Sequence, residues 1–284
     1  MTWLYLALTA ALFWAVGQVL VKKGFENVPP LWNNIIFYVL ALLLWVPASL
    51  WLSNFEISIP TFPVFFIIAL AQAAYMIFFY AIVKGELALT GTIVAGYPVT
   101  TVVLSQIFLG ERLAPVQVLG ITLVLLGAVA ISLPERGLPK EVRDLSWIKW
   151  GVAAAILIGF ADFLSKISIN QIGSYSNIFF LTFLALPLLL INYLVDKKNR
   201  PRPKLSGKKS LPTLAGNLVL SVGTFVFYLA LGQGDASLVV PVSSIYPAFI
   251  AILAMAFLRE KVTVKQGAGI VSAVLGIILT GLGS

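Results

Sequence analysis

Residues 97–112 read YPVTTVVLSQIFLGER, and residues 246–261, 149 positions later, read YPAFIAILAMAFLREK. Both segments open with a Tyr-Pro pair in an apolar run and close with Phe-Leu followed by an acidic and a basic residue. The match continues without a gap over about 45 residues and places Gln117 over Gln266 and Gly120 over Gly269. Matched polar residues, glycines and prolines at a fixed spacing indicate a duplicated chain, because chance similarity between apolar segments would give only scattered Leu and Val matches.

The duplication extends toward the start of each half with a slightly different spacing. A shift of 144 positions places Val19-Leu20-Val21-Lys22 over Phe163-Leu164-Ser165-Lys166 and Asn33 over Asn177. The sequence therefore predicts a first repeat over residues 1–133, a connecting loop over 134–147 and a second repeat over 148–284.

The composition places the chain in a membrane. Of its 284 residues, 60% are apolar and only 11% are charged, with a mean hydropathy of +1.00, whereas soluble domains carry about 25% charged residues. The absence of Cys and His excludes disulfides, thiolate or imidazole metal sites and Ser-His-Asp triads. Because P-loop and GxGxxG motifs are also absent, we expect no metal and no cofactor.

Apolar runs long enough to cross about 30 Å of hydrocarbon occur ten times. The predicted fold is an all-α integral membrane protein with ten transmembrane helices. Because each half holds five helices, an odd number, the second half must insert upside down, which gives two inverted five-helix repeats. The runs lie near residues 3–21, 32–52, 62–83, 88–109, 115–133, 148–169, 175–195, 211–231, 236–258 and 264–282.

The basic residues predict an orientation. Of the 19 lysines and arginines, 17 fall in the loops that follow odd-numbered runs, and such residues are concentrated on the cytoplasmic side of membrane proteins. The odd-numbered loops, with the 134–147 connection among them, are therefore expected to be cytoplasmic and both termini to lie outside. The net charge of +8 is thus an orientation signal, and we expect no nucleic-acid partner.

These features together resemble a known family. Two inverted five-helix halves, each with an apolar helix ending in Phe108-Leu109-Gly110-Glu111-Arg112 or Phe257-Leu258-Arg259-Glu260-Lys261 before a Gly-rich helix, resemble the drug/metabolite transporter superfamily and its EamA-like branch. The resemblance covers nearly the whole chain. It implies a secondary transporter, often an exporter of amino acids or other small metabolites, with a central cavity between the halves.

Two charged residues, Asp162 and Lys166, lie well inside an apolar run. Their i, i+4 spacing places them on one helix face, where they can pair. Ionisable residues inside membrane helices mark ion or substrate pathways by default. Since the chain has no histidine, Asp162 is the candidate for proton coupling and substrate binding, with a structural ion pair as the alternative. Gln18, its repeat partner, is expected to face the same cavity.

The two Tyr-Pro pairs, Tyr97-Pro98 and Tyr246-Pro247, interrupt the fourth and ninth runs. A proline inside a helix removes a hydrogen bond and produces a kink, and broken helices near the midplane form the binding sites of many transporters. We expect both tyrosines to line the cavity. The alternative is that the kinks only shape the bundle.

Further candidates surround these pairs. Pro241 adds a second kink to the ninth run, and Ser243 follows it by two positions. Trp14, Tyr80 and Tyr228 lie inside the first, third and eighth runs, where their rings can form an amphipathic wall for an organic solute. Packing or lipid contact is the alternative for these aromatic residues.

The prediction for function is a secondary active transporter, not an enzyme, in the inner (plasma) membrane. It would export amino acids or related small metabolites by alternating access, as a monomer or homodimer. A lipid or lipid-linked sugar flippase, which the same superfamily contains, is the alternative. An intramembrane aspartyl protease is more distant: Gly232-Gln233-Gly234-Asp235 matches a GxGD pattern and Asp162 could supply the second carboxylate, but Gly234-Asp235 has its repeat counterpart in Gly85-Glu86, as a structural turn would.

Overall fold

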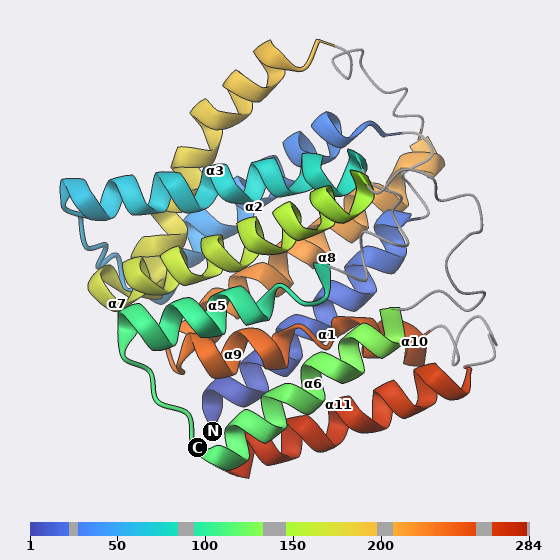
Figure 1. Ribbon diagram of the computed structural model, residues 1–284. Helices are drawn as coiled ribbons and strands as arrows, with labels where there is room; N and C mark the ends of the chain where they lie inside the picture. Colours follow the sequence, from blue (N-terminus) through green and yellow to red (C-terminus); the bar gives the residue numbers. More distant parts are fainter. Residues whose placement is uncertain (23–27, 85–93, 133–145, 198–206, 254–262, 283–284) are drawn as a thin grey trace.

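The computed structural model describes residues 1–22, 28–84, 94–132, 146–197, 207–253 and 263–282, and within them the chain is a bundle of helices joined by short turns (Figure 1). An all-helical membrane architecture is thereby confirmed. The elements are α1 Thr2–Lys22, α2 Pro30–Leu52, α3 Phe62–Lys84, α5 Pro98–Leu104, the π-helical turn η1 Ser105–Leu109, α6 Pro115–Ser132, α7 Ser146–Val195, α8 Gly207–Leu231, α9 Ala236–Ser243, α10 Tyr246–Leu253 and α11 Val264–Leu282.

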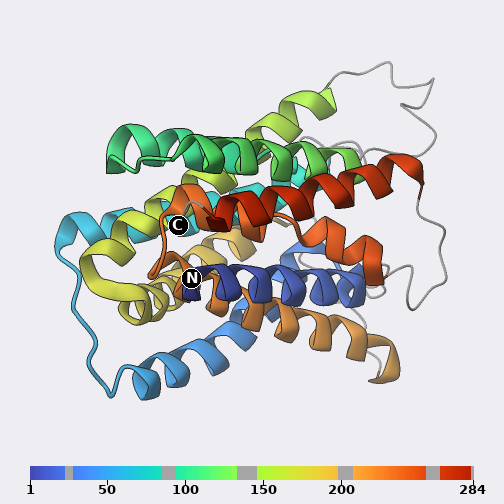
Figure 2. The same ribbon diagram turned by 90° about the horizontal axis from the view of Figure 1, so that it is seen from below.

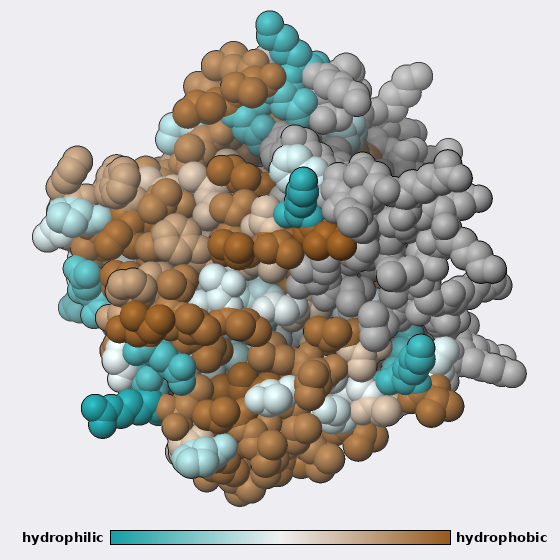
Figure 3. Space-filling view, viewed as in Figure 1, coloured by the Kyte–Doolittle hydropathy of each residue, from teal (hydrophilic) through white to brown (hydrophobic). Residues whose placement is uncertain are grey.

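Seven stretches of the described chain are long and apolar enough to cross a membrane, and two further apolar helices, over Phe62–Ile77 and Pro98–Leu109, are shorter. Large apolar side chains such as Leu43, Phe66 and Leu126 are exposed on different helices. Figure 3 shows this as a hydrophobic surface across much of the described face, with hydrophilic residues nearer its edges. Exposed apolar area of this extent suits contact with lipid. The number of ten spans stays a prediction.

Helix α7 is broken at Gly173. A continuous helix over its 48-residue apolar stretch would be about 72 Å long, more than twice the hydrocarbon thickness. Gly173 has φ 78° and ψ 162°, a conformation essentially restricted to glycine. The chain reverses there into a second leg, visible in both ribbon views (Figures 1 and 2). The break falls between the two helices expected over 148–169 and 175–195.

The fourth and ninth runs are broken more completely than a proline kink requires. Residues 95–97 form a turn before α5, and residues 244–245 separate α9 from α10. Pro98 is the first residue of α5, where its missing N–H costs no hydrogen bond. Pro241 lies inside α9, and Pro247 is the second residue of α10. The expected kinked ninth helix is therefore two short helices, and the described part of the fourth run has a turn before α5. Residues 88–93 and 254–258 of these runs lie outside the described part.

Helices of the first half pack against helices of the second half: α1 lies on α8, α3 on α7, and α6 on α11. A Cβ atom added at Gly120 would lie 2.7 Å from the carbonyl oxygen of Gly276, and one at Gly127 would lie 2.5 Å from that of Gly269. Gly120 and Gly127 are the repeat partners of Gly269 and Gly276 respectively, so exchanging the halves maps each contact onto the other. This two-fold relation between antiparallel helices is what an inverted repeat produces.

The matched glutamines cap matched helices. The side-chain oxygen of Gln117 accepts from the Ala114 backbone N–H at 2.8 Å before α6, and that of Gln266 accepts from the Thr263 N–H at 3.0 Å before α11. A residue three positions into a helix that bonds back to the N-cap is the capping-box arrangement. Glutamine therefore recurs in the repeat because it satisfies an otherwise free backbone donor.

Glu111 of the first half caps a helix of the second half. Its carboxylate accepts from the N–H groups of Ala236 at 2.9 Å and Ser237 at 2.8 Å, at the start of α9. An acidic side chain at a helix N-terminus satisfies free donors and interacts favourably with the helix dipole. Gly110, with φ 69°, adopts the left-handed conformation that ends η1 directly before Glu111.

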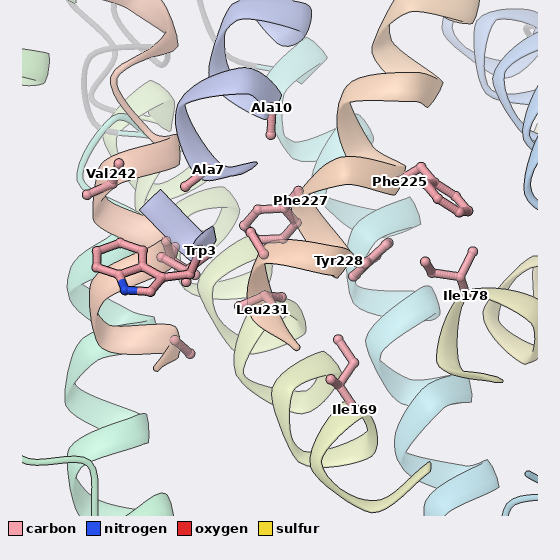
Figure 4. Packing of buried hydrophobic residues seen from close by; sticks show 14 of the residues in the cluster. Trp3, Ala7, Ala10, Ile169, Ile178, Phe225, Phe227, Tyr228, Leu231 and Val242 are labelled. Carbon is pink, nitrogen blue, oxygen red and sulfur yellow. The ribbon is translucent and has the colours of Figure 1, made fainter. Parts of the chain in front are cut away.

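The core lies where α1, α7, α8 and α9 meet (Figure 4). Ala7 and Ala10 of α1 belong to this cluster together with Phe227 and Tyr228 of α8. Trp45 of α2 is buried against this cluster, and its indole N–H donates to the Ser221 carbonyl at 3.0 Å. The core therefore positions Tyr228, one of the candidate site residues.

We expect Gly120→Ala to destabilise the protein. The added methyl group would lie 2.5 Å from the Thr280 hydroxyl oxygen and close to backbone atoms of α11, and overpacking of this kind costs about 1–3 kcal/mol. Thermal unfolding in detergent should show a lower midpoint. Gly267→Ala is the control, since nothing lies within 4 Å of its added Cβ; an equal loss in both variants would contradict the close contact.

Replacing the Glu111 carboxylate should weaken the link to α9. We expect Glu111→Ala to lose about 0.5–2 kcal/mol of stability, the usual cost of removing an N-terminal cap, with faster hydrogen exchange at the amides of Ala236 and Ser237. Glu56→Ala, which removes the same charge at an exposed site, is the control. Unchanged exchange at those two amides would show that the cap contributes nothing.

Candidate functional site

Asp162 is buried, with 3% of its surface exposed. It lies about 21 Å along the helix from Ile148 and about 16 Å from Gly173, so it is near the middle of the first leg of α7. The Tyr75 hydroxyl on α3 donates a hydrogen bond to its carboxylate oxygen Oδ1. Within the described membrane-spanning stretches, Asp162 is the one acidic residue. Its hydrogen bond to Tyr75 joins the two halves of the chain.

Further tyrosines surround this bond. The Tyr228 hydroxyl of α8 interacts with that of Tyr75, and Tyr97, in the turn before α5, is an electrostatic neighbour of Asp162. Tyr38 of α2 lies next in line, beside Tyr228. The rings of Tyr38, Tyr97 and Tyr228 are buried. The carboxylate of Asp162 is therefore enclosed by phenol groups and apolar surface.

A related pair lies across the bundle. The Gln18 side chain of α1 interacts with the Tyr246 hydroxyl of α10, and Tyr246 is an electrostatic neighbour of Tyr97. Gln18 and Tyr246 are the repeat partners of Asp162 and Tyr97. Corresponding residues therefore lie near each other twice in the fold, with a neutral amide in the first half and an acid in the second.

Two more candidates complete this polar region. The indole N–H of Trp14 donates to the Thr224 hydroxyl at 3.0 Å, and its ring meets that of Tyr246 edge-on with 6.2 Å between centroids. Ser243, at the end of α9, interacts with the Tyr97 hydroxyl and donates to the Val240 carbonyl at 3.0 Å.

The structure thus connects most of the candidates: Trp14, Gln18, Tyr97, Asp162, Tyr228, Ser243 and Tyr246. The side chain of Tyr80 lies outside the described residues. Sequence reasoning missed Tyr75, the hydrogen-bond donor to Asp162. The sequence held no signal for it, because Tyr75 meets Asp162 only through the packing of α3 on α7.

The structural alternative for Asp162, an ion pair with Lys166, is not formed among the described residues. The Lys166 ammonium donates to the carbonyl oxygens of Leu231 at 2.8 Å and Gly234 at 2.9 Å, at the end of α8, and its charged neighbours are Glu111 and Asp235. The last carbonyls of a helix lack intrahelical donors and carry partial negative charge, so they attract a cation that can reach them. Lys166 therefore binds the end of α8, and the described contacts of Asp162 are with tyrosines.

Two hollows lie away from Asp162. One, of about 320 Å³, is lined by Trp3, Arg112, Gln117, Gln233, Gly234, Asp235 and Leu238 at the end of the bundle. The other, of about 370 Å³, lies between α3 and the second leg of α7 and is lined by Ala73, Met76, Ile77, Leu188, Ile191, Asn192, Val195 and Asp196. The first is polar and next to the Lys166 contacts, whereas the second is mostly apolar.

Comparison with known proteins adds an independent line of evidence. An uncharacterized transporter of Archaeoglobus fulgidus is 25% identical over 96% of both chains. An uncharacterized protein of Methanocaldococcus jannaschii is 45% identical over 62 residues, which are 22% of this chain and 45% of that protein, so the chain spans less than half the length of this relative.

The fold has a solved counterpart. A crystal structure matches 99% of this chain and 96% of its own with a TM-score of 0.83 at 18% identity, which shows a shared fold. The sequence pattern of the EamA-like transporter family matches twice, over residues 1–133 and 145–282. Duplicated halves, broken helices and the Phe-Leu-x-Glu motif thus have one explanation: the chain belongs to the EamA-like transporter family.

Proposed function

We propose that the protein is a secondary active transporter that exports amino acids or related small metabolites by alternating access through ten transmembrane helices. The observation that carries this proposal is the hydrogen bond between Tyr75 of the first half and Asp162 of the second. A site shared between inverted halves near the middle of the bundle can be opened to either side as the halves move.

Proton coupling through Asp162 fits its surroundings. A charged carboxylate inside the membrane is costly unless it is paired, and its described partners are phenol groups, which carry no positive charge at neutral pH. Proton binding removes the charge, so occupancy of Asp162 by a proton favours a closed and dry site. Gain and loss of this proton on opposite sides would couple transport to a pH gradient.

The positions of the termini support an even number of crossings. Leu4 of α1 lies beside Gly281 of α11, and both ribbon views show the start of α1 near the end of α11 (Figures 1 and 2). Both ends of the chain therefore lie on one side of the bundle. Together with the distribution of basic residues, this supports a plasma-membrane protein with cytoplasmic odd-numbered loops and termini outside.

The alternatives receive less support. A lipid flippase needs a polar path open to lipid, but the groove between α3 and α7 is mostly apolar, and Asp162 is not among its lining residues. A protease dyad requires two carboxylates that share a proton. Asp162 is instead buried against Tyr75, while Asp235 is exposed at the start of α9.

The decisive variant is Asp162→Asn, which keeps the shape of the side chain and removes its titration. We expect transport of amino acids and amines driven by a pH gradient in proteoliposomes to fall to background, because no proton can be exchanged at the site. Glu56→Gln, an exposed acid, should transport normally. Wild-type pH coupling in Asp162→Asn would refute the assigned role.

Tyr75→Phe tests the hydrogen bond between the halves. A hydrogen bond to a charged group contributes about 1.5–3 kcal/mol, so we expect at least a tenfold loss of transport and a changed pH profile. Tyr5→Phe, which removes an exposed phenol hydroxyl, should leave both unchanged. An unaltered pH profile in Tyr75→Phe would show that this bond does not act on Asp162.

A further inference from the structure

Two buried polar groups near Asp162 make no hydrogen bond of normal geometry within the described residues. Gln72, one turn before Tyr75 on α3, is fully buried; its side chain lies near the Tyr38 hydroxyl, but neither atom of its carboxamide forms such a bond. The Ser165 hydroxyl, one turn after Asp162, is likewise buried and lies near the Tyr228 hydroxyl without a bond of normal geometry. A buried polar group whose hydrogen bonds are incomplete destabilises the folded protein. Groups that fold at this cost, next to the buried acid, mark a place where something polar binds.

The charge of the site specifies the class of ligand. The titratable groups that face Asp162 are Tyr75 on α3, Tyr97 before α5 and Tyr228 on α8, with Tyr38 on α2 behind them, and α9 carries none. All are neutral phenols at neutral pH. The ionised site therefore has one negative charge, and a single cation neutralises it.

A carboxylate-bearing ligand meets an obstacle in the same site. An amino acid would bring its own carboxylate next to Asp162, and that group would need a cation. Lys149 and Lys265 lie at the ends of described membrane-spanning stretches, and Lys166 is the basic residue in their interior. The Lys166 ammonium is bound to the Leu231 and Gly234 carbonyls. A zwitterion would thus add a negative charge with no described counter-ion nearby.

We propose that Gln72, Tyr75, Asp162, Ser165 and Tyr228 form a binding site for a monovalent organic amine, which exchanges with the proton of Asp162. This inference rests on the proposed transport function and narrows its substrate to amines. The ammonium group forms an ion pair with the carboxylate, and the proton that Asp162 held leaves to solvent, so one positive charge replaces another.

Each residue has a defined part. The carboxamide oxygen of Gln72 and the hydroxyl oxygen of Ser165 accept ammonium N–H groups, which completes the hydrogen bonding of two buried groups. The phenol rings offer their faces to the cation and its apolar body, a cation–π interaction that strengthens when water is excluded.

Four probes of one shape test the class of ligand: phenethylamine, phenylalanine, 3-phenylpropionate and 2-phenylethanol. The protein in lipid nanodiscs is titrated with each by calorimetry at pH 8 and pH 5.5, in buffers of different ionisation enthalpy. We expect phenethylamine to bind tightest and to release a proton when it binds to the protonated protein. Its affinity should therefore fall at the lower pH.

The variants separate binding from structure. Asp162→Asn should lose phenethylamine binding and proton release. Gln72→Leu should weaken phenethylamine binding about tenfold. It should also raise the unfolding temperature, because it removes a buried polar group whose hydrogen bonds are incomplete. If the glutamine were purely structural, the same substitution would lower that temperature. Gln106→Leu, at an exposed position on η1, is the control. Gln72→Asn, which keeps the amide but shortens it, should weaken binding if Gln72→Leu does not fold.

The outcomes are separable from those of the proposed function. Equal or tighter binding of phenylalanine or 3-phenylpropionate, no binding of phenethylamine, or binding without proton release would each overturn the amine site. Transport of other metabolites in proteoliposomes would still support the transporter. Conversely, phenethylamine binding with proton release but no transport of any probe would support the amine site and refute the proposed function.

Discussion

Backbone groups inside a membrane must find partners within the protein, and the architecture depends on this constraint. The two ends of a helix leave free N–H or carbonyl groups, and side chains can serve as their partners. Glu111 supplies acceptors at the start of α9, and Lys166 supplies donors at the end of α8. These two charges are therefore committed to the scaffold, which leaves Asp162 as the buried acid available for the proposed exchange.

The repeat makes the scaffold symmetric but leaves the site asymmetric. The Gly120–Gly276 and Gly127–Gly269 contacts map onto each other when the halves are exchanged. The polar pairs Gln18–Tyr246 and Asp162–Tyr97 occupy corresponding places, but only the second contains a titratable acid. For the proposed alternating access, a single acid on one side would let protonation distinguish two otherwise related arrangements.

Much of the fold could be predicted from sequence because glycines, prolines and long apolar runs have local consequences. Asp162 was identifiable because a lone acid in an apolar run is rare. Its partners were not, because Tyr75 and Gln72 meet it only through the packing of α3 on α7. The actual partners of Lys166 were hidden for the same reason: spacing along one helix shows which side chains can meet, but it does not reveal the carbonyl oxygens at the end of α8 that bind this ammonium.

The two roles of charge in this protein explain why so few charges lie within its helices. A charge that stabilises the scaffold must stay bound in every conformation, as Glu111 does when it holds two backbone donors. A charge that carries out exchange must have partners weak enough to be replaced, and phenol hydroxyls meet this requirement because they donate to a carboxylate without neutralising it. A lysine beside Asp162 would have fixed the carboxylate permanently. By binding the end of α8, Lys166 leaves the acid without this counter-ion, and under the proposed exchange a proton and an amine would compete for the one position beside it.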